Sequence, residues 1–363
     1  MEELKEKENR IQAFMEEKGL EALLLRRLSN FAWCTGGAAS FVNTASETGV
    51  ASLLITKEAR YVITNNIEAM RLSEEEGLKR QGWEFVVGNW WEPGEAVVEF
   101  AAGLKLGADV SWPGAVDVRE DFARLRYVLL PEEMERFRQV GHICGQAVQA
   151  AARRAKPGMS EYQIAAILAE EAMARGCQPI VNLTATDERI FSYRHPIPTS
   201  KVMERYAMLV LCARRWGLVA SATRFVHFGP LYEEVARKHV AVATVDATAI
   251  AHTRPGTRVA EIFRRIQEAY AKANYPGEWQ LHHQGGLAGY EPREYIATPN
   301  SQETIQAGQA FAWNPSITGT KSEDTILVGQ EGNEIITAVG EWPTLSIEIE
   351  GQIIERPAIL QIT

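Results

Sequence analysis

The chain has 363 residues, of which 46% are hydrophobic and 23% charged, and its formal net charge is -9. This length exceeds one typical hydrophobic core, so two domains are expected. The composition is typical of a globular protein. The negative charge disfavours nucleic-acid binding, which needs clustered Lys and Arg side chains to neutralise phosphates.

No apolar run approaches the roughly 18 residues that a helix needs to cross a bilayer, and the charged amino terminus lacks the apolar segment of a signal peptide. The cysteines have neither the spacing of a zinc site nor that of a disulfide framework. They are Cys34, Cys144, Cys177 and Cys212. We therefore expect a cytoplasmic protein with no membrane partner and no nucleic-acid partner.

The amino-terminal part of the chain alternates helical and strand patterns, which predicts a layered α/β domain. Its predicted elements are a helix over 4–18, strands over 22–25, 50–55 and 60–64, a helix over 65–76 and a strand over 83–87. The composition shifts near residues 125–131. We place the domain boundary there, which gives domains over 1–126 and 127–363.

The second domain contains an internal repetition. A helix over 147–156, a Pro-Gly break and a second helix over 160–175 recur as helices over 231–253 and 259–274, again with Pro-Gly between them. Strand-rich sequence follows each helix pair. The pattern fits a duplicated helix–helix–sheet unit, and it also fits the common use of Pro-Gly as a helix breaker.

Residues 209–224 resemble the strand-pair motif D-x-G-x4-G-x3-D-x-T-R of the creatinase/prolidase/aminopeptidase P family. Thr223 and Arg224 match that motif, whereas Val210 and Ser221 stand at its two aspartates. The resemblance implies an α/β two-domain protein. It would consist of a small N-terminal creatinase-like domain and a C-terminal pita-bread domain, an α+β fold with pseudo-twofold duplication.

The family usually holds two divalent metals on two Asp, one His and two Glu. His283 matches the metal-binding histidine and Glu323 the last glutamate, but Val210, Ser221 and Asn314 replace the other three ligands. A hard dication prefers several anionic oxygens. The resemblance therefore implies a member that has lost the dinuclear centre, with no metal and no cofactor.

Three residues are the expected catalytic groups. His195 stands where the metal-free creatinase branch carries its general acid/base, a task that suits imidazole because its pKa lies near neutrality. His283 is expected to donate a hydrogen bond to substrate, or to be held by Glu323 as a structural residue. Glu323 is expected to bind a cationic group or to tune a histidine. His282 is expected to point to the other side of a strand, because adjacent strand residues face opposite ways.

The expected substrate-binding residues are Tyr290, Arg293 and Asn314. Tyr290 takes the place of a second active-site histidine of the family. The stretch around Arg293 is similar to one in creatinases whose arginine binds the substrate carboxylate, and a guanidinium fork suits that task. A surface ion pair of Arg293 with Glu291 or Glu294 is the alternative. Asn314 is expected to hydrogen-bond the same ligand.

Three functions follow from the resemblance. The first, which we favour, is a metal-independent creatinase-like hydrolase of a C–N bond in a small amidine, guanidino or amide metabolite. The second is an Xaa-Pro aminopeptidase or dipeptidase with an altered metal site, which needs about three good protein ligands. The third is a non-catalytic ligand-binding protein. The expected partners are a small-molecule or short-peptide substrate and a second copy of the chain in a homodimer. Residues 345–357 predict a carboxyl-terminal hairpin around Gly351.

Overall fold

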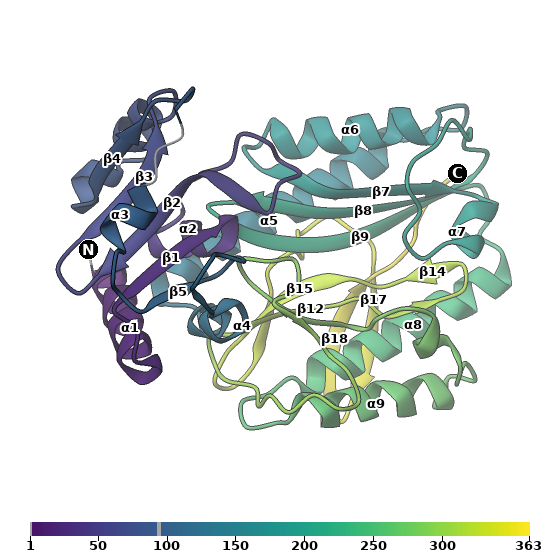
Figure 1. Ribbon diagram of the computed structural model, residues 1–363. Helices are drawn as coiled ribbons and strands as arrows, with labels where there is room; N and C mark the ends of the chain where they lie inside the picture. The colour runs from purple at the N-terminus through teal and green to yellow at the C-terminus, as the bar shows by residue number, and fades with distance from the viewer. Residues whose placement is uncertain (1, 93–95) are drawn as a thin grey trace. The chain divides into compact units, whose positions relative to one another are not determined.

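The computed structural model describes residues 2–92 and 96–363, and the chain divides into two compact units (Figure 1). The first unit consists of residues 1–127 with 216–218, and the second of residues 128–215 with 219–363. Across the described residues, no helix combines the length and the apolar character that a membrane crossing requires.

The first unit is built on a six-stranded mixed sheet with the order β4-β3-β2-β1-β5-β6. The central strand β1 is antiparallel to β2 and parallel to β5. It is buried on both faces, because Leu23, Leu24 and Leu25 are all fully buried. The strands are β1 (Ala22–Arg27), β2 (Thr48–Thr56), β3 (Arg60–Asn65), β4 (Glu84–Gly88), β5 (Leu106–Ala108) and β6 (Val116–Asp117).

Several short helices complete this unit. They are α1 (Glu2–Lys18), α2 (Leu28–Cys34), α3 (Ala96–Phe100), α4 (Arg119–Ala123), η1 (Arg71–Glu75), η2 (Leu78–Gln81) and η3 (Arg124–Arg126). The helix predicted over 65–76 is wrong over 65–68. The Asn65 side chain accepts hydrogen bonds from the backbone N–H groups of Ile67 and Glu68. This local turn competes with a helix start, and a π-helical turn, η1, follows it.

The second unit shows the predicted duplication, and the expected fold class is confirmed. Two helices precede each of two sheets, a mixed one with the order β19-β9-β8-β7 and an antiparallel one with the order β11-β10-β12-β15-β16. The two helix pairs lie on opposite sides of the sheets (Figure 1). The first half holds α5 (Pro131–Arg154), α6 (Glu161–Met173), β7 (Gln178–Thr186), α7 (Glu188–Ser192), β8 (Tyr206–Arg215) and β9 (Leu218–Phe228).

The second half repeats this order and adds short strands. It holds α8 (Glu233–His252), α9 (Val259–Lys272), η4 (Glu278–Leu281), β10 (Gly285–Ala288), β11 (Tyr295–Ile296), β12 (Ala310–Trp313), β13 (Ser316–Ile317), β14 (Thr320–Lys321), β15 (Asp324–Val328) and β16 (Asn333–Ile335). The helix expected from residue 147 begins at Pro131 instead. Proline is favoured in a first helical turn, and the Glu133 side chain accepts from the N–H of Leu130.

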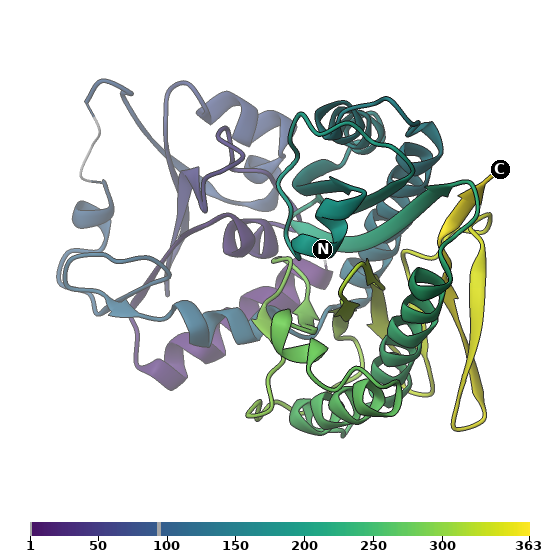
Figure 2. The same ribbon diagram turned by 90° about the vertical axis from the view of Figure 1, so that its right-hand side faces the viewer.

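The carboxyl-terminal hairpin is present as β17 (Thr344–Ile349) and β18 (Gln352–Pro357), followed by β19 (Leu360–Ile362). Its turn places Glu350 and Gly351 at positive φ. The hairpin runs beside α8 (Figure 2), and β19 then joins the first sheet parallel to β9. The end of the described chain is thus an integral part of the second unit.

A buried ion network fastens the hairpin to the rest of the unit. The guanidinium of Arg356, on β18, donates to Asp246 of α8 at 2.9 Å and to Asp324 of β15 at 2.8 Å. Asp324 also accepts from Arg224 of β9 at 2.9 Å. All four side chains are almost fully buried, so each charge depends on its partners.

Position 285, at the start of β10, needs a glycine because of its backbone conformation and because of the atoms around it. Its φ is +105°, and a Cβ at this position would lie 2.1 Å from the carbonyl oxygen of Ala312. We expect Gly285→Ala to lower the free energy of unfolding by more than about 2 kcal/mol, because backbone crowding adds to the cost of positive φ. Urea denaturation at unchanged m-value measures the loss.

The control for this substitution is Gly256→Ala. Gly256 also has a positive φ, of +88°, but a Cβ there would meet no atom within 4 Å. This variant reports the conformational cost alone. An equal loss in the two variants would contradict the role of crowding at Gly285.

Candidate functional site

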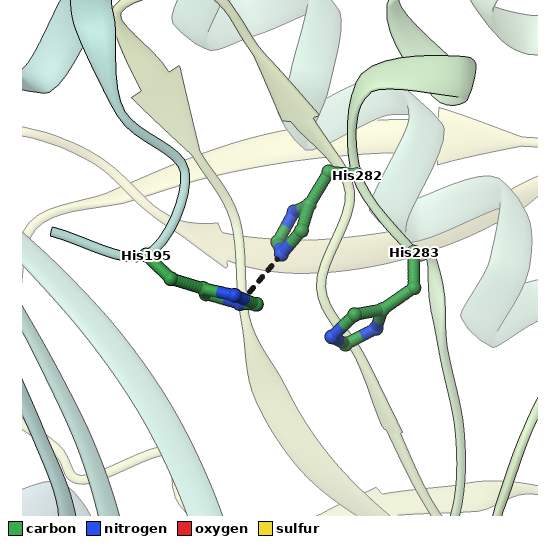
Figure 3. Close-up of side chains that lie close together, drawn as sticks. All are labelled: His195, His282 and His283. Atoms are coloured by element: carbon green, nitrogen blue, oxygen red, sulfur yellow. Dashed lines mark hydrogen bonds between the residues drawn. The ribbon is translucent and has the colours of Figure 1, made fainter.

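Three histidines from two separate segments meet in the second unit. His195 lies in the loop after α7, and His282 and His283 lie between η4 and β10. Their rings turn toward one another (Figure 3), with ring nitrogens within 4.8 Å. The Nε2 atoms of His195 and His282 are 3.0 Å apart, a hydrogen-bond distance. His195 is exposed, whereas His282 is buried.

The place of His282 corrects the sequence-based expectation. The 3-10 helix η4 ends at Leu281 and β10 begins only at Gly285. His282 is therefore not in a strand, and the alternation of strand residues does not apply to it. It lies in the centre of the histidine cluster instead of facing away from it.

The three imidazoles are neutral at pH 7. Burial lowers the pKa of His195 and of His282, and the ammonium of Lys321 lowers both further. Burial and the guanidinium of Arg293 lower the pKa of His283 to about 4. A hydrogen bond between two neutral imidazoles needs one N–H and one lone pair, so the tautomers of His195 and His282 must differ at their facing nitrogens.

The amide of Asn314 decides which nitrogen carries the proton. Its Oδ1 accepts from Nη2 of Arg293 at 3.1 Å, and a guanidinium can only donate. Its Nδ2 therefore faces the other way, 3.4 Å from Nε2 of His282 and 3.4 Å from the carbonyl oxygen of His283. Because Nδ2 can only donate, Nε2 of His282 is assigned as an acceptor.

The remaining protons follow from this assignment. Nδ1 of His282 carries the hydrogen and donates to Oγ of Ser316 at 3.1 Å. His195 then donates from Nε2 to the lone pair on Nε2 of His282 at 3.0 Å, and the longer contact from Asn314, at 3.4 Å, shares that lone pair. Nδ1 of His195 keeps its own lone pair. The chain of contacts from Arg293 to His195 thus presents a proton acceptor on the exposed histidine.

His283 differs from His195 and His282 in that its ring has no hydrogen-bond partner among the described residues. Its Nδ1 is buried. A buried polar atom without a partner is uncommon and calls for an explanation. A ligand that bonds this ring would supply one.

Arg293 is engaged inside the protein. Its Nη1 donates to Oγ of Ser221 at 3.3 Å and to the carbonyl of Pro292 at 2.6 Å. Its Nη2 donates to Asn314 and, at 3.0 Å, to Oε1 of Glu323. The four terminal N–H groups are therefore used. No terminal N–H group of Arg293 is left to bind a substrate carboxylate, which is the role that the sequence predicts for it. The acidic partner of the guanidinium is Glu323 and not Glu291 or Glu294.

Glu323 is charged and already compensated. Its Oε2 accepts from Oγ1 of Thr223 at 2.6 Å and from Nζ of Lys321 at 2.8 Å. Burial raises its pKa, but the ammonium of Lys321 and the guanidinium of Arg293 outweigh burial and lower the pKa to about 2. The expected task of binding a cationic group of a ligand is thus already performed by two cations of the chain.

Comparison with known proteins identifies the relatives of this chain. Residues 8–140 match the creatinase/prolidase N-terminal domain, and residues 135–330, more than half of the chain, match metallopeptidase family M24. The chain belongs to metallopeptidase family M24. This confirms the creatinase/prolidase resemblance, and hydrolysis of C–N bonds is the chemistry of the M24 peptidases.

Several of the similar proteins carry peptidase names. An Xaa-Pro dipeptidase of Pyrococcus horikoshii is 23% identical over 357 residues, which is 93% of this chain and 98% of that protein. An uncharacterised peptidase of Staphylococcus haemolyticus is 23% identical, over 61% of this chain and only 65% of that protein. The structure of an Xaa-Pro dipeptidase from Bacillus anthracis superposes with a TM-score of 0.79 at 19% identity, over 99% of this chain and 100% of that chain.

The M24 metal positions of this chain do not fit a dinuclear centre. Val210 is 3% exposed and packs in an apolar cluster with Leu183, Met208 and Phe225. Ser221 offers a neutral hydroxyl, which lies against Sγ of Cys212 and the guanidinium of Arg293. Asn314 and Glu323 contact the same guanidinium. The oxygen ligands that remain are therefore bound to a cation of the protein.

Among the described residues, the histidine cluster is the group whose side chains could together hold a metal ion. Three neutral imidazoles suit a transition-metal ion, and their nitrogens lie within 4.8 Å of one another. Two features act against a dication there. A hydrogen bond already joins His195 to His282, and the charge of Lys321 lowers the pKa of all three rings.

Tyr290 has a structural contact in place of the expected substrate contact. Its side chain is 2% exposed, and its hydroxyl donates to Oε1 of Glu133 at 2.6 Å. The other oxygen of Glu133 caps the start of α5. Tyr290 thus holds the first turn of α5.

Proposed function

We propose that this M24 member hydrolyses a C–N bond of a small amidine, guanidino or amide metabolite without the dinuclear metal centre of its family, and that His195 is the general base. The observation that carries the proposal is the hydrogen-bond chain that leaves Nδ1 of the exposed His195 as a proton acceptor. Beside it lies the ring of His283, whose buried Nδ1 has no hydrogen-bond partner among the described residues. A neutral imidazole of lowered pKa is suited to accept a proton at neutral pH.

The proposed reaction moves one proton through His195. Nδ1 of His195 takes a proton from water as the water oxygen attacks the carbon of the scissile bond. The C–N bond then breaks, and the same proton passes from Nδ1 to the leaving nitrogen. A ring N–H of His283 donates to the oxygen or nitrogen that gains negative charge, since such a donor stabilises the transition state more than the ground state.

The test is turnover by protein stripped of metals with a chelator. The substrates are guanidino acids, amidines, small amides and Xaa-Pro dipeptides, with product amine as the readout. The pKa of His195 is lowered from 6.5, and a base works only when it is unprotonated. We therefore expect kcat/KM to rise with pH through an inflection below 6.5 and to stay level through neutral pH. Turnover that disappears on chelation and returns with Mn²⁺ would contradict the proposal.

An Xaa-Pro dipeptidase with an altered metal site is the second candidate. It is favoured by the similarity, over 93% of this chain, to a protein named as an Xaa-Pro dipeptidase. Metal-dependent cleavage of the dipeptides would support it. A non-catalytic binding protein would show thermal stabilisation by one of the same compounds with no product formed.

A further inference from the structure

We propose that the guanidinium of Arg293 replaces a divalent metal ion in this chain and excludes such an ion from the site. This goes beyond the proposed function, because it concerns what occupies the old metal position and not which bond is cleaved. It explains how Glu323 can remain buried and charged although Ser221 and Asn314 stand at two positions where the family has metal-binding carboxylates.

The contacts of Arg293 coincide with the metal positions of the family. Of the five positions, three supply a partner to one guanidinium: Ser221 at 3.3 Å, Asn314 at 3.1 Å and Glu323 at 3.0 Å. Ser221 lies in β9, Asn314 directly follows β12, and Glu323 directly precedes β15. A single group that touches all three must lie in the space they enclose, which in the family is the space for an ion.

The charges support the same conclusion. Glu323 is 2% exposed, and a buried carboxylate needs a partner of opposite charge. Arg293 meets one oxygen of Glu323, and Lys321 meets the other at 2.8 Å. The carboxylate of Glu323 is therefore already paired with two positively charged side chains of the chain itself. A dication at the same place would lie against a guanidinium and would share its ligands.

The decisive experiment puts carboxylates back at positions 221 and 314, once with Arg293 present and once with Arg293 removed. The double variant Ser221→Asp/Asn314→Glu keeps Arg293, and the triple variant adds Arg293→Ala. The probe is Mn²⁺, because it prefers oxygen ligands, whereas softer ions would bind the three imidazoles. At a concentration about a hundredfold above its Kd, we expect Mn²⁺ to raise the Tm of the triple variant by about 5 °C. We expect no shift in the double variant or the natural chain.

Each other outcome contradicts the inference. Mn²⁺ binding by the double variant as tight as that by the triple variant would show that the guanidinium does not exclude the ion. A folded triple variant that binds no Mn²⁺ would show that Arg293 does not lie at the metal position. One equivalent of Mn²⁺ bound to the natural chain would show that the guanidinium of Arg293 does not exclude the ion. Equilibrium dialysis gives the stoichiometry, and circular dichroism confirms that each variant is folded.

A second measurement avoids the engineered carboxylates. Arg293→Ala leaves a guanidinium-sized space beside Glu323, so guanidinium chloride at low millimolar concentration is expected to recover part of the lost Tm, whereas equal NaCl is not. Arg293→Lys is the matched variant that keeps the charge and loses the fork. Equal effects of the two salts on Arg293→Ala would contradict the inference. These readouts are stability and metal binding, so they stay separate from the turnover that tests the proposed function.

Discussion

Replacing His195 by Gln lowers kcat/KM by about 100-fold or more, because the loss of a positioned general base removes that much catalysis. Glutamine keeps a polar side chain that can still donate to Nε2 of His282, so the hydrogen bond of 3.0 Å has a substitute. It has no group that titrates near neutral pH. The measurement is kcat/KM over a range of pH with the best substrate of the metal-free screen.

The control for this substitution is His142→Gln. His142 is an exposed histidine on α5, outside the histidine cluster, so its replacement leaves kcat/KM unchanged. The pH profile distinguishes loss of the general base from a structural disturbance, because the acidic inflection disappears in His195→Gln only if His195 is the titrating base. A variant that retains both its rate and its inflection would exclude His195 from the reaction.

Replacing Arg356 by Ala lowers the free energy of unfolding of the second unit by about 3–5 kcal/mol. Arg356 is fully buried, and Asp246 and Asp324 both rely on its guanidinium. Its removal leaves Asp246 without a cationic partner in the described part of the chain, while Asp324 retains Arg224. Urea denaturation followed by tryptophan fluorescence measures the loss, since Trp342 lies close to the hairpin and donates to the carbonyl of Ala358.

Arg254→Ala is the matched control for this second substitution. Arg254 also holds the hairpin, through a hydrogen bond of 2.7 Å to Gln352, but this contact is exposed. Its loss is expected to cost no more than about 1 kcal/mol, because water replaces an exposed partner. If the two arginines cost the same, the buried network does not stabilise the hairpin in the way described.

Local patterns in the sequence, together with the family motif, predicted the duplicated fold. The Pro-Gly breaks after α5 and α8, and the strand pair with Thr223 and Arg224, depend on residues close together in the chain. The hairpin around Gly351 is of the same kind. The family motifs also predicted that His283 and Glu323 belong to one site. The order of the motifs along the chain identifies the positions that correspond to the family's ligands, even where the residue type differs.

The interior of the site could not be predicted in the same way. The bond of Arg293 to Ser221 joins residues 72 positions apart, and the bond of His195 to His282 joins residues 87 apart. No local pattern records such pairs. Arg293 was expected either to bind a substrate carboxylate or to pair with Glu291 or Glu294, because its distant partner Glu323 leaves no local signal in the sequence. His282 was assigned to the wrong face because its segment contains no strand.

The position of Arg356 and β19 also constrains how the protein is made. On the ribosome, β9, α8 and β15 emerge well before the residues that give β9 its parallel neighbour and that neutralise Asp246. Until those residues are available, Asp246 lacks the arginine that pairs with it and β9 lacks its parallel neighbour. We therefore expect that the second unit cannot complete its native sheet and ion network without residues 356–362.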